Sequence, residues 1–294
     1  MESKVNNEKV SIGVIILNYL AYETTIQTVN SFFSQNSDGF ELFYVIVDNC
    51  SQNESYEELC NEYRGNSNVI VVKTNRNLGF AKGNNFGYEK LCERFSPDFI
   101  IVSNDDILLP QPRLFHWIVD SYEKYKFGVL GPDVYSVKGE FHQSPVENVT
   151  RNIKTLKKIM LKFQLQIVKC FFLHLIKTSN YSGVPTWENN YFRVFSDKLT
   201  LHGSFLIFSN NYFRFYKEPF DPSTFLYMEE DFLKLRCDKQ NIKMIYSPSY
   251  QINHLQAVST NMISKTPYKK EITRLKNRKK SLKLFIKKLR RKSY

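Results

Sequence analysis

The stretch Phe99–Pro110, FIIVSNDDILLP, joins a strand-like run of apolar residues to two adjacent aspartates. Phe99–Val102 is apolar and β-branched, the pattern of a strand buried on both faces of a sheet. Asp105 and Asp106 follow it, and because two neighbouring carboxylates repel each other, their adjacency needs a reason. Either they cap a turn, where aspartate is favoured, or they belong to a site for a hard divalent cation. This segment alone leaves both interpretations open.

The segments before this stretch predict the fold class. Three further strand-like runs precede it, at Val10–Leu17, Leu42–Val47 and Val69–Lys73. Segments long enough for helices lie between the four runs, at Tyr22–Phe33, Tyr56–Arg64 and Gly79–Arg94. This alternation predicts an α/β fold with a mainly parallel central sheet flanked by helices on both faces.

Polar residues follow all four predicted strands. They are Asn18 and Tyr19, Asp48 to Ser51, Asn75 to Asn77, and Asn104 to Asp106. Ligands of such sheets bind at the carboxyl ends of the strands, where helix N-termini also point. The four exits therefore predict one shared site along one edge of the sheet.

Two later segments add candidate catalytic groups. Glu229, Glu230 and Asp231 begin a predicted helix, where they either complement the helix dipole or supply a general base. His254 ends a strand-like run, and it is either a structural histidine or a metal ligand beside Asp106.

Composition indicates a globular protein with free thiols. The 294 residues are 42% apolar and 15% aromatic, and the five cysteines are scattered without paired spacing. No apolar run approaches the roughly 18–20 residues of a membrane-spanning helix. The polar start MESKVNNEKV carries no secretory signal, so we expect a cytoplasmic protein.

The net charge of +12 is concentrated near one end of the sequence. Lys269–Tyr294 holds 13 Lys and Arg and a single acid, with apolar residues that can share one helical face. These residues are Ile272, Leu275, Leu282, Ile286 and Leu289. The segment predicts a basic amphipathic helix on an anionic membrane surface; a solvated tail and nucleic-acid binding are the alternatives. No nucleic-acid-binding module supports nucleic-acid binding by this segment, so we expect no nucleic-acid partner.

The segment Arg151–Lys177 predicts a second basic helix with an apolar stripe.

Seven motifs follow one another along the chain: VIILNY, VDNCSQN, NRNLGFAKGNN, IIVSNDDILLP, LHGSFLIF, FLYMEEDFLKLR and INHLQAVST. In this order they resemble the family 2 glycosyltransferases, most closely the bacterial enzymes that build capsule, O-antigen and other surface polysaccharides. The resemblance implies a GT-A domain over residues 1–260, with a nucleotide-sugar half at 10–110 and an acceptor half at 111–260, followed by a basic tail at 261–294. It implies inverting transfer from a UDP- or dTDP-sugar to a hydroxyl of a lipid-linked glycan, with Mn²⁺ or Mg²⁺, at the inner face of the cell membrane. The oligomeric state is left open.

The resemblance also assigns residues to roles. The donor-binding set is Asn18, Tyr19, Asp48, Asn77, Gly79, Asn85, Asn104 and Asp105. The metal ligands are Asp106 and His254, and the catalytic base is Glu230, with Asp231 as its rival because Glu-Glu-Asp leaves the register open. The acceptor-binding set is His202, Gly203, Tyr227 and Glu229.

The sequence departs from the family pattern in two further positions. Asn104 replaces the first aspartate of the usual DxD, and Asn49 stands where many members have a second aspartate. A non-catalytic nucleotide-sugar- or glycan-binding protein on the same fold is the alternative. A nucleotidyltransferase is less favoured, since LNYLAYETT is not its glycine- and arginine-rich loop.

Overall fold

The computed structural model describes residues 9–175, 192–256 and 266–291. The strands are β1 (Val10–Asn18), β2 (Phe40–Asp48), β3 (Val69–Lys73), β4 (Phe99–Asn104), β5 (Ile107–Leu108), β6 (Val129–Ser136), β7 (Phe141–His142), β8 (Phe205–Ser209) and β9 (Met244–His254). The helices are α1 (Tyr22–Phe33), α2 (Ser55–Glu62), α3 (Gly79–Cys92), α4 (Leu114–Tyr125), α5 (Ile153–Leu175), α6 (Asn210–Phe213), α7 (Glu229–Lys239) and α9 (Pro267–Arg290). The helix and strand types predicted from the sequence are confirmed, with ends that differ by a few residues.

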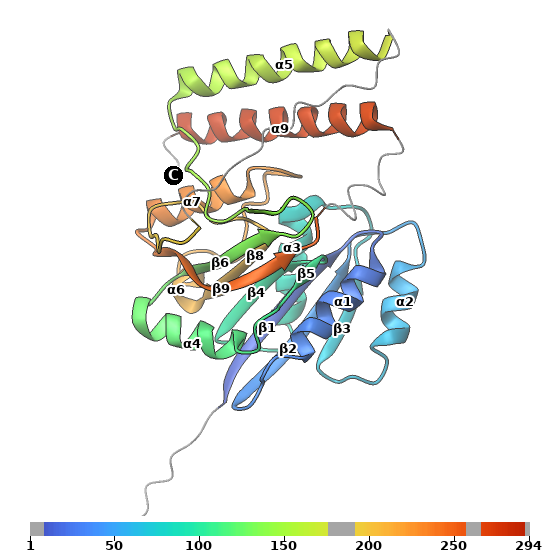
Figure 1. Cartoon of the computed structure of the whole chain (residues 1–294), viewed down its shortest axis with the longest axis vertical. Helices are drawn as coiled ribbons and strands as arrows, with labels where there is room; N and C mark the ends of the chain where they lie inside the picture. Colours follow the sequence, from blue (N-terminus) through green and yellow to red (C-terminus); the bar gives the residue numbers. More distant parts are fainter. Residues whose placement is uncertain (1–8, 176–191, 257–265, 292–294) are drawn as a thin grey trace, which may run out of the picture.

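The strands form one sheet in the order β3-β2-β1-β4-β8-β6-β9-β5, with β7 paired to β6 (Figure 1). The first four strands of this order pair in parallel, as predicted. Beyond them β8 runs antiparallel to both β4 and β6, and β5 runs antiparallel to β9. The α/β class is therefore confirmed, and the sheet is mixed rather than purely parallel. The difference arises where the strand–helix alternation of the sequence stops, after residue 110.

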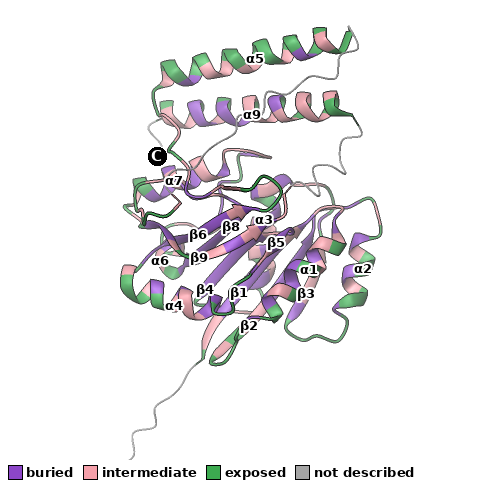
Figure 2. Ribbon diagram, in the orientation of Figure 1, coloured by how far each residue is buried: buried purple, intermediate pink, exposed green. Residues whose placement is uncertain are grey.

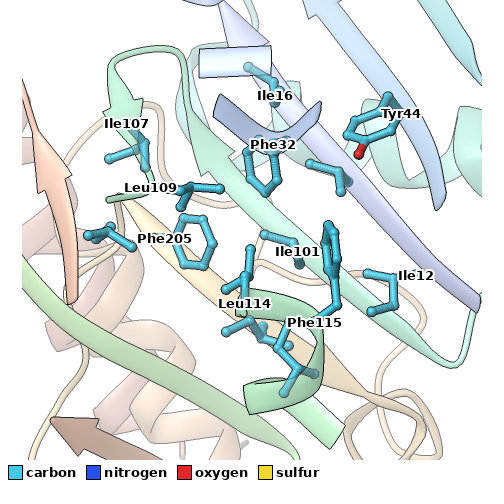
Figure 3. Close-up of a cluster of buried hydrophobic side chains, with 14 of the residues drawn as sticks. Ile12, Ile16, Phe32, Tyr44, Ile101, Ile107, Leu109, Leu114, Phe115 and Phe205 are labelled. Carbon is cyan, nitrogen blue, oxygen red and sulfur yellow. The ribbon is translucent and has the colours of Figure 1, made fainter. Parts of the chain in front are cut away.

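Helices cover both faces of the sheet. One apolar cluster joins residues of the strands to α1, α2 and α4, and its members include Ile16, Phe32, Leu59 and Phe115 (Figure 3). The other cluster joins the opposite side of the strands to α3, α6 and α7. Figure 2 shows the strands buried between these two layers. Because successive strand residues point to opposite faces, strands covered on both sides are apolar throughout.

A pair of long helices, α5 and α9, lies beside α7 (Figure 1). Leu156 of α5, Phe232 of α7 and Phe285 of α9 belong to one apolar cluster. The helix predicted near the end of the sequence is confirmed, but its apolar face, including Leu275 and Leu282, is buried inside the protein. Its packing partners are α5 and α7, which a sequence pattern cannot specify. The predicted domain boundary between 260 and 261 lies outside the described residues.

All five cysteines are free, as expected. Within residues 9–175, 192–256 and 266–291, no helix combines the length and the apolar character needed to cross a membrane.

Candidate active site

The carboxyl ends of β1, β2 and β4 lie at the same level. Asn18 is in register with Asp48, and Leu17 is in register with Asn104. Asn18 Nδ2 donates to Asp48 Oδ2 at 2.8 Å, and the backbone N–H of Ser51 donates to Asp48 Oδ1 at 2.9 Å. Asn18 and Asp48 are fully buried, so hydrogen bonds fix the position of this carboxylate at the edge.

The loop before α3 is held by Asn49, a residue to which the sequence analysis gave no role. Its Oδ1 accepts from the N–H of Leu78 at 2.8 Å, and its Nδ2 donates to the carbonyl of Gly79 at 3.2 Å. Asn77 Oδ1 accepts from the N–H of Gly79 at 2.9 Å. An amide can donate and accept at once, whereas the aspartate usual at position 49 can only accept. The sequence signal for this role of Asn49 was its position directly after Asp48, at the end of a predicted strand.

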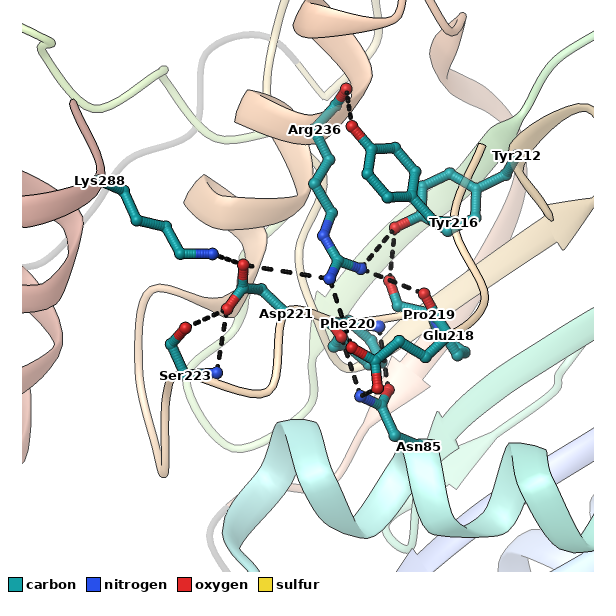
Figure 4. A network of polar contacts seen from close by, with 10 residues as sticks. All are labelled: Asn85, Tyr212, Tyr216, Glu218, Pro219, Phe220, Asp221, Ser223, Arg236 and Lys288. Atoms are coloured by element: carbon teal, nitrogen blue, oxygen red, sulfur yellow. Dashed lines mark hydrogen bonds and ion pairs between the residues drawn. The ribbon is translucent and has the colours of Figure 1, made fainter. Parts of the chain in front are cut away.

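Asn85 differs from the other predicted donor-binding residues, because its side chain holds a distant loop. Its Nδ2 donates to Glu218 Oε2 and to the carbonyl of Phe220, both at 2.8 Å, and its Oδ1 accepts from the N–H of Phe220 at 3.0 Å. The same loop contacts Arg236 of α7 and, through Asp221, Lys288 of α9 (Figure 4). Asn85 therefore joins α3 to the loop that α7 and α9 also contact.

The two aspartates of FIIVSNDDILLP lie between β4 and β5, where the chain crosses to the far edge of the strand order. Asp105 Oδ2 accepts from the backbone N–H of Tyr19 at 3.4 Å. β5 pairs with β9 so that Ile107 is opposite His254, which brings Asp106 Oδ1 to 3.2 Å from His254 Nε2. The antiparallel β5–β9 pairing thus joins the two predicted metal ligands.

The Asp106–His254 pair fits a divalent cation. Among the residues that the structure describes, none donates a hydrogen bond to the buried Asp106 Oδ1. His254 Nδ1 lies 2.7 Å from Gln143 Oε1, so the proton of a neutral ring is on Nδ1 and the Nε2 lone pair faces the carboxylate. Two acceptors in contact need a cation or a proton between them, and adjacent ligands about 2.1 Å from one ion lie roughly 3 Å apart. In the part of the chain that the structure describes, no third histidine, cysteine or carboxylate completes a metal cluster, so the remaining ligands would be substrate oxygens and water.

One turn connects the metal pair to the acid cluster, which we define as Glu229, Glu230 and Asp231. The rings of His202 and His254 lie 5.7 Å apart. On the next residue, the N–H of Gly203 donates to Glu230 Oε1 at 3.2 Å. A Cβ on Gly203 would lie 2.6 Å from the same oxygen, so only glycine allows this approach. The predicted base and the predicted metal ligands therefore lie on the two sides of the turn His202–Ser204.

Burial raises the pKa of all three acids at the start of α7. Burial, followed by the neighbouring charge of Glu230, raises the pKa of Glu229 to about 8 and that of Asp231 to about 7. Burial also raises the pKa of Glu230, while the backbone N–H groups of Glu230 and Gly203 partly offset that effect. Of the three, Glu230 bonds the predicted acceptor turn at Gly203, so the geometry favours it over Asp231 as the base. Burial and the nearby His254 lower the pKa of His202 to about 3, which keeps that ring neutral.

Helix α9 supports the turn that enters the acid cluster. Tyr227 and Met228 have positive φ angles of 72° and 71°, a conformation that side chains other than glycine rarely adopt. Ser281 Oγ of α9 donates to the carbonyl of Leu226 at 2.9 Å, next to these two residues. The guanidinium carbon of Arg278 lies 5.8 Å from the centre of the Tyr227 ring, and its charge counteracts the rise in the pKa of Glu230. These roles could not be predicted from the sequence, because α9 is distant from the cluster in the chain.

The sequence profile of glycosyl transferase family 2 matches residues 11–217, which is more than half of the chain. The protein belongs to the family 2 glycosyltransferases. No functionally curated protein matches the sequence closely enough to count as a relative.

Solved structures show the same fold. The chain is similar to residues 1–349 of S. aureus TarS, with a TM-score of 0.51, 13% identity, and coverage of 84% of this chain and 60% of TarS 1–349. The corresponding complex with UDP-GlcNAc gives a TM-score of 0.52 at 14% identity, covering 87% of this chain and 61% of that one. GalNAc-T7, solved with UDP, GalNAc and Mn²⁺, gives a TM-score of 0.59 at 13% identity, covering 92% of this chain and 49% of that chain. The chain therefore spans about half to three fifths of these solved chains.

These matches confirm the predicted family and its GT-A fold. The structure brings together Asn18, Asp48 and Asn104 at the strand ends, and Asp106, His254, His202, Gly203 and Glu230 around one turn. The side chain of Asn85 instead bonds Glu218 and Phe220. The role of each of these residues stays a prediction.

Proposed function

We propose that this protein is a metal-dependent, inverting glycosyltransferase of bacterial surface polysaccharide biosynthesis. It moves a sugar from a UDP- or dTDP-sugar to a hydroxyl of a lipid-linked glycan at the inner face of the cell membrane. The observation that carries the proposal is the Glu230 carboxylate, which lies on one side of the turn whose other side contacts the Asp106–His254 pair. The UDP-GlcNAc in a TarS structure and the UDP and Mn²⁺ with GalNAc-T7 support the choice of donor and metal.

The chemistry follows from this arrangement. Glu230 accepts the proton of an acceptor hydroxyl, whose oxygen bonds the anomeric carbon as the bond from that carbon to the diphosphate breaks. Attack opposite the leaving group inverts the anomeric configuration, and the bonding electrons leave with the diphosphate. Asp106 and His254 would hold a divalent cation, which supplies positive charge for the diphosphate. A carboxylate with a raised pKa is a stronger base than one in water, which suits Glu230 to this role.

The first test is nucleotide release from a panel of nucleotide sugars with Mn²⁺ or Mg²⁺ and a lipid-linked glycan acceptor. We expect Glu230→Gln to lower kcat by about 10³-fold, since general-base catalysis contributes 10²–10⁴-fold, and to leave nucleotide-sugar binding unchanged. Asp231→Asn is the matched control and should cost less than about tenfold, because its carboxylate does not bond the turn at Gly203.

Two outcomes would overturn parts of the proposal. Full activity of Glu230→Gln would remove Glu230 from the role of base. Nucleotide-sugar binding without turnover of any donor and acceptor pair would favour the alternative, a non-catalytic binding protein on this fold.

A further inference from the structure

Helix α5 has two apolar faces, and the described residues of the chain cover one of them and leave the other exposed. The inner face, which includes Leu156 and Phe163, packs in the cluster shared with α7 and α9. The outer face carries large apolar side chains that are 42–60% exposed. They are Leu161, Leu165, Val168, Phe171, Phe172 and Leu175. Figure 2 shows the outer side of α5 as largely exposed.

The exposed residues form a continuous stripe. Positions 161, 165, 168, 172 and 175 follow helical spacings of three and four, so their side chains share one face along the helix. Soluble proteins seldom expose a contiguous apolar surface of this kind unless it contacts something. Helix α9 cannot make the membrane contact that its sequence predicts, because the apolar face of that helix is already buried.

The charge around the stripe indicates what covers it. Five exposed lysines lie on α5, which has no acidic residue: Lys154, Lys157, Lys158, Lys162 and Lys169. The neighbouring α9 adds eleven Lys and Arg against one acid. Pairing this face with a second copy of the chain would bring like charges together. A nucleic acid would meet the lysines but leave six apolar side chains beside its phosphates.

We infer that the outer face of α5 binds the surface of an anionic membrane. The stripe enters the boundary between headgroups and acyl chains, the lysines contact anionic headgroups, and the helix lies flat, since it is not apolar enough to cross. With 23 residues, α5 would contact the surface over about 35 Å.

This orientation agrees with the position of the acid cluster. In Figure 1, α5 is the outermost element, and α9 lies between it and α7, the helix that begins with Glu229. The acid cluster thus lies toward the membrane-facing end of the molecule. The link between membrane binding and a lipid-linked acceptor rests on the proposed function. Vesicle binding itself requires no catalysis, so it can be absent while the proposed function holds, or present while the proposed function fails.

The test is co-sedimentation of the full chain with vesicles of phosphatidylglycerol and phosphatidylcholine in equal parts, compared with phosphatidylcholine alone. We expect binding to the anionic vesicles, reduced at least about tenfold in the double variant Leu165→Gln and Phe172→Gln. The matched control is Val194→Gln with Phe215→Gln, which removes two exposed apolar side chains away from α5. It should bind like the wild type.

A second variant tests the lysines. Lys158→Gln, Lys162→Gln and Lys169→Gln together should lower anionic-vesicle binding about tenfold or more, whereas the same changes at the exposed Lys124, Lys138 and Lys198 should have little effect. Three results would overturn the inference: no vesicle binding by the wild type, unchanged binding by the α5 variants, or a dimer that the stripe variant converts to a monomer without any vesicle binding.

Discussion

Two regions of the molecule are built in different ways. One is the donor-side edge, which we define as Asn18, Asp48 and Asn49 at the strand ends predicted to bind the donor, and the other is the acid cluster. At the donor-side edge, Asn18, Asp48 and Asn49 are held by hydrogen bonds whose partners all lie within the first 79 residues. The acid cluster, at the start of α7, depends on two distant segments: the turn at Gly203, whose N–H bonds Glu230, and α9, whose Ser281 bonds the carbonyl of Leu226 just before the cluster. The first region is locally determined, whereas the second exists only when distant parts of the chain have packed together. Changes in α9 should therefore affect acceptor chemistry before donor binding.

The largest expected effect concerns the junction of the two regions, at Asp106. Asp106→Asn should lower turnover by about 10³-fold, or about 4 kcal/mol, because the neutral amide binds a divalent cation poorly. Titration of turnover with Mn²⁺ measures the effect, and the exposed Asp38→Asn is the control. Wild-type activity and metal dependence in Asp106→Asn would contradict the assignment of this metal ligand.

Phe285→Ala tests the dependence of the acid cluster on α9. Phe285 is 1% exposed, and its ring centre lies 5.2 Å from that of Phe232 of α7, so its loss leaves a cavity costing about 3–4 kcal/mol. Urea unfolding measures the change, and Phe215→Ala, at an exposed position, should cost little. Where the variant is still folded, turnover should fall while nucleotide binding persists. A parallel loss of both would mean that the two regions are not independent.

The pH dependence of stability tests the burial of Glu229. Its pKa is about 8 in the folded protein and 4.5 ordinarily, so between these values the folded state binds more protons than the unfolded state. Stability from this group is greatest below pH 4.5 and falls as the pH rises through 8. Glu229→Gln should thus stabilise the protein by about 2 kcal/mol at pH 9 and much less at pH 5, as measured by urea unfolding at both values. The exposed Glu89→Gln is the control, and an unchanged pH profile in Glu229→Gln would be evidence against a buried acid.

The smallest effect is expected from two glycines, one in each region. Gly203→Ala should displace the Glu230 carboxylate and lower kcat about tenfold with donor binding unchanged. Gly79→Ala, with a φ of +77° and a Cβ position 2.1 Å from the carbonyl oxygen of Phe225, should instead weaken donor binding. Kinetics with varied donor concentration separate the two. Gly65→Ala controls for backbone strain, since it has a φ of +83° and open space around it. Identical kinetic effects of the first two substitutions would refute the division into two regions.

The part of the fold that depends on local patterns could be predicted from the sequence. The β-branched runs and the polar exits specify β1 to β4 and the edge where Asn18, Asp48 and Asn104 meet, because parallel strands joined by helices end on the same side. The acids at the start of α7 were also recognisable, since their position follows from a helix start.

Long-range pairing could not be predicted. Nothing near Asp106 indicates that β5 pairs with β9, or that β8 lies between β4 and β6. Asn85 was assigned to the donor, but its partners Glu218 and Phe220 lie more than 130 residues away. The amphipathic pattern of α9 predicted a helix with one covered face, yet a membrane and a neighbouring helix require the same pattern.

The Ser281–Leu226 hydrogen bond has a consequence for how the protein matures during synthesis. Residues 10–104 contain β1 to β4 and can pair before the rest of the chain has been made, since chains fold from the N-terminus as they are synthesised. The turn before Glu229 gains its hydrogen bond from α9 when Ser281 has emerged from the ribosome. A nascent chain can therefore complete its donor-side edge before its acid cluster is in position.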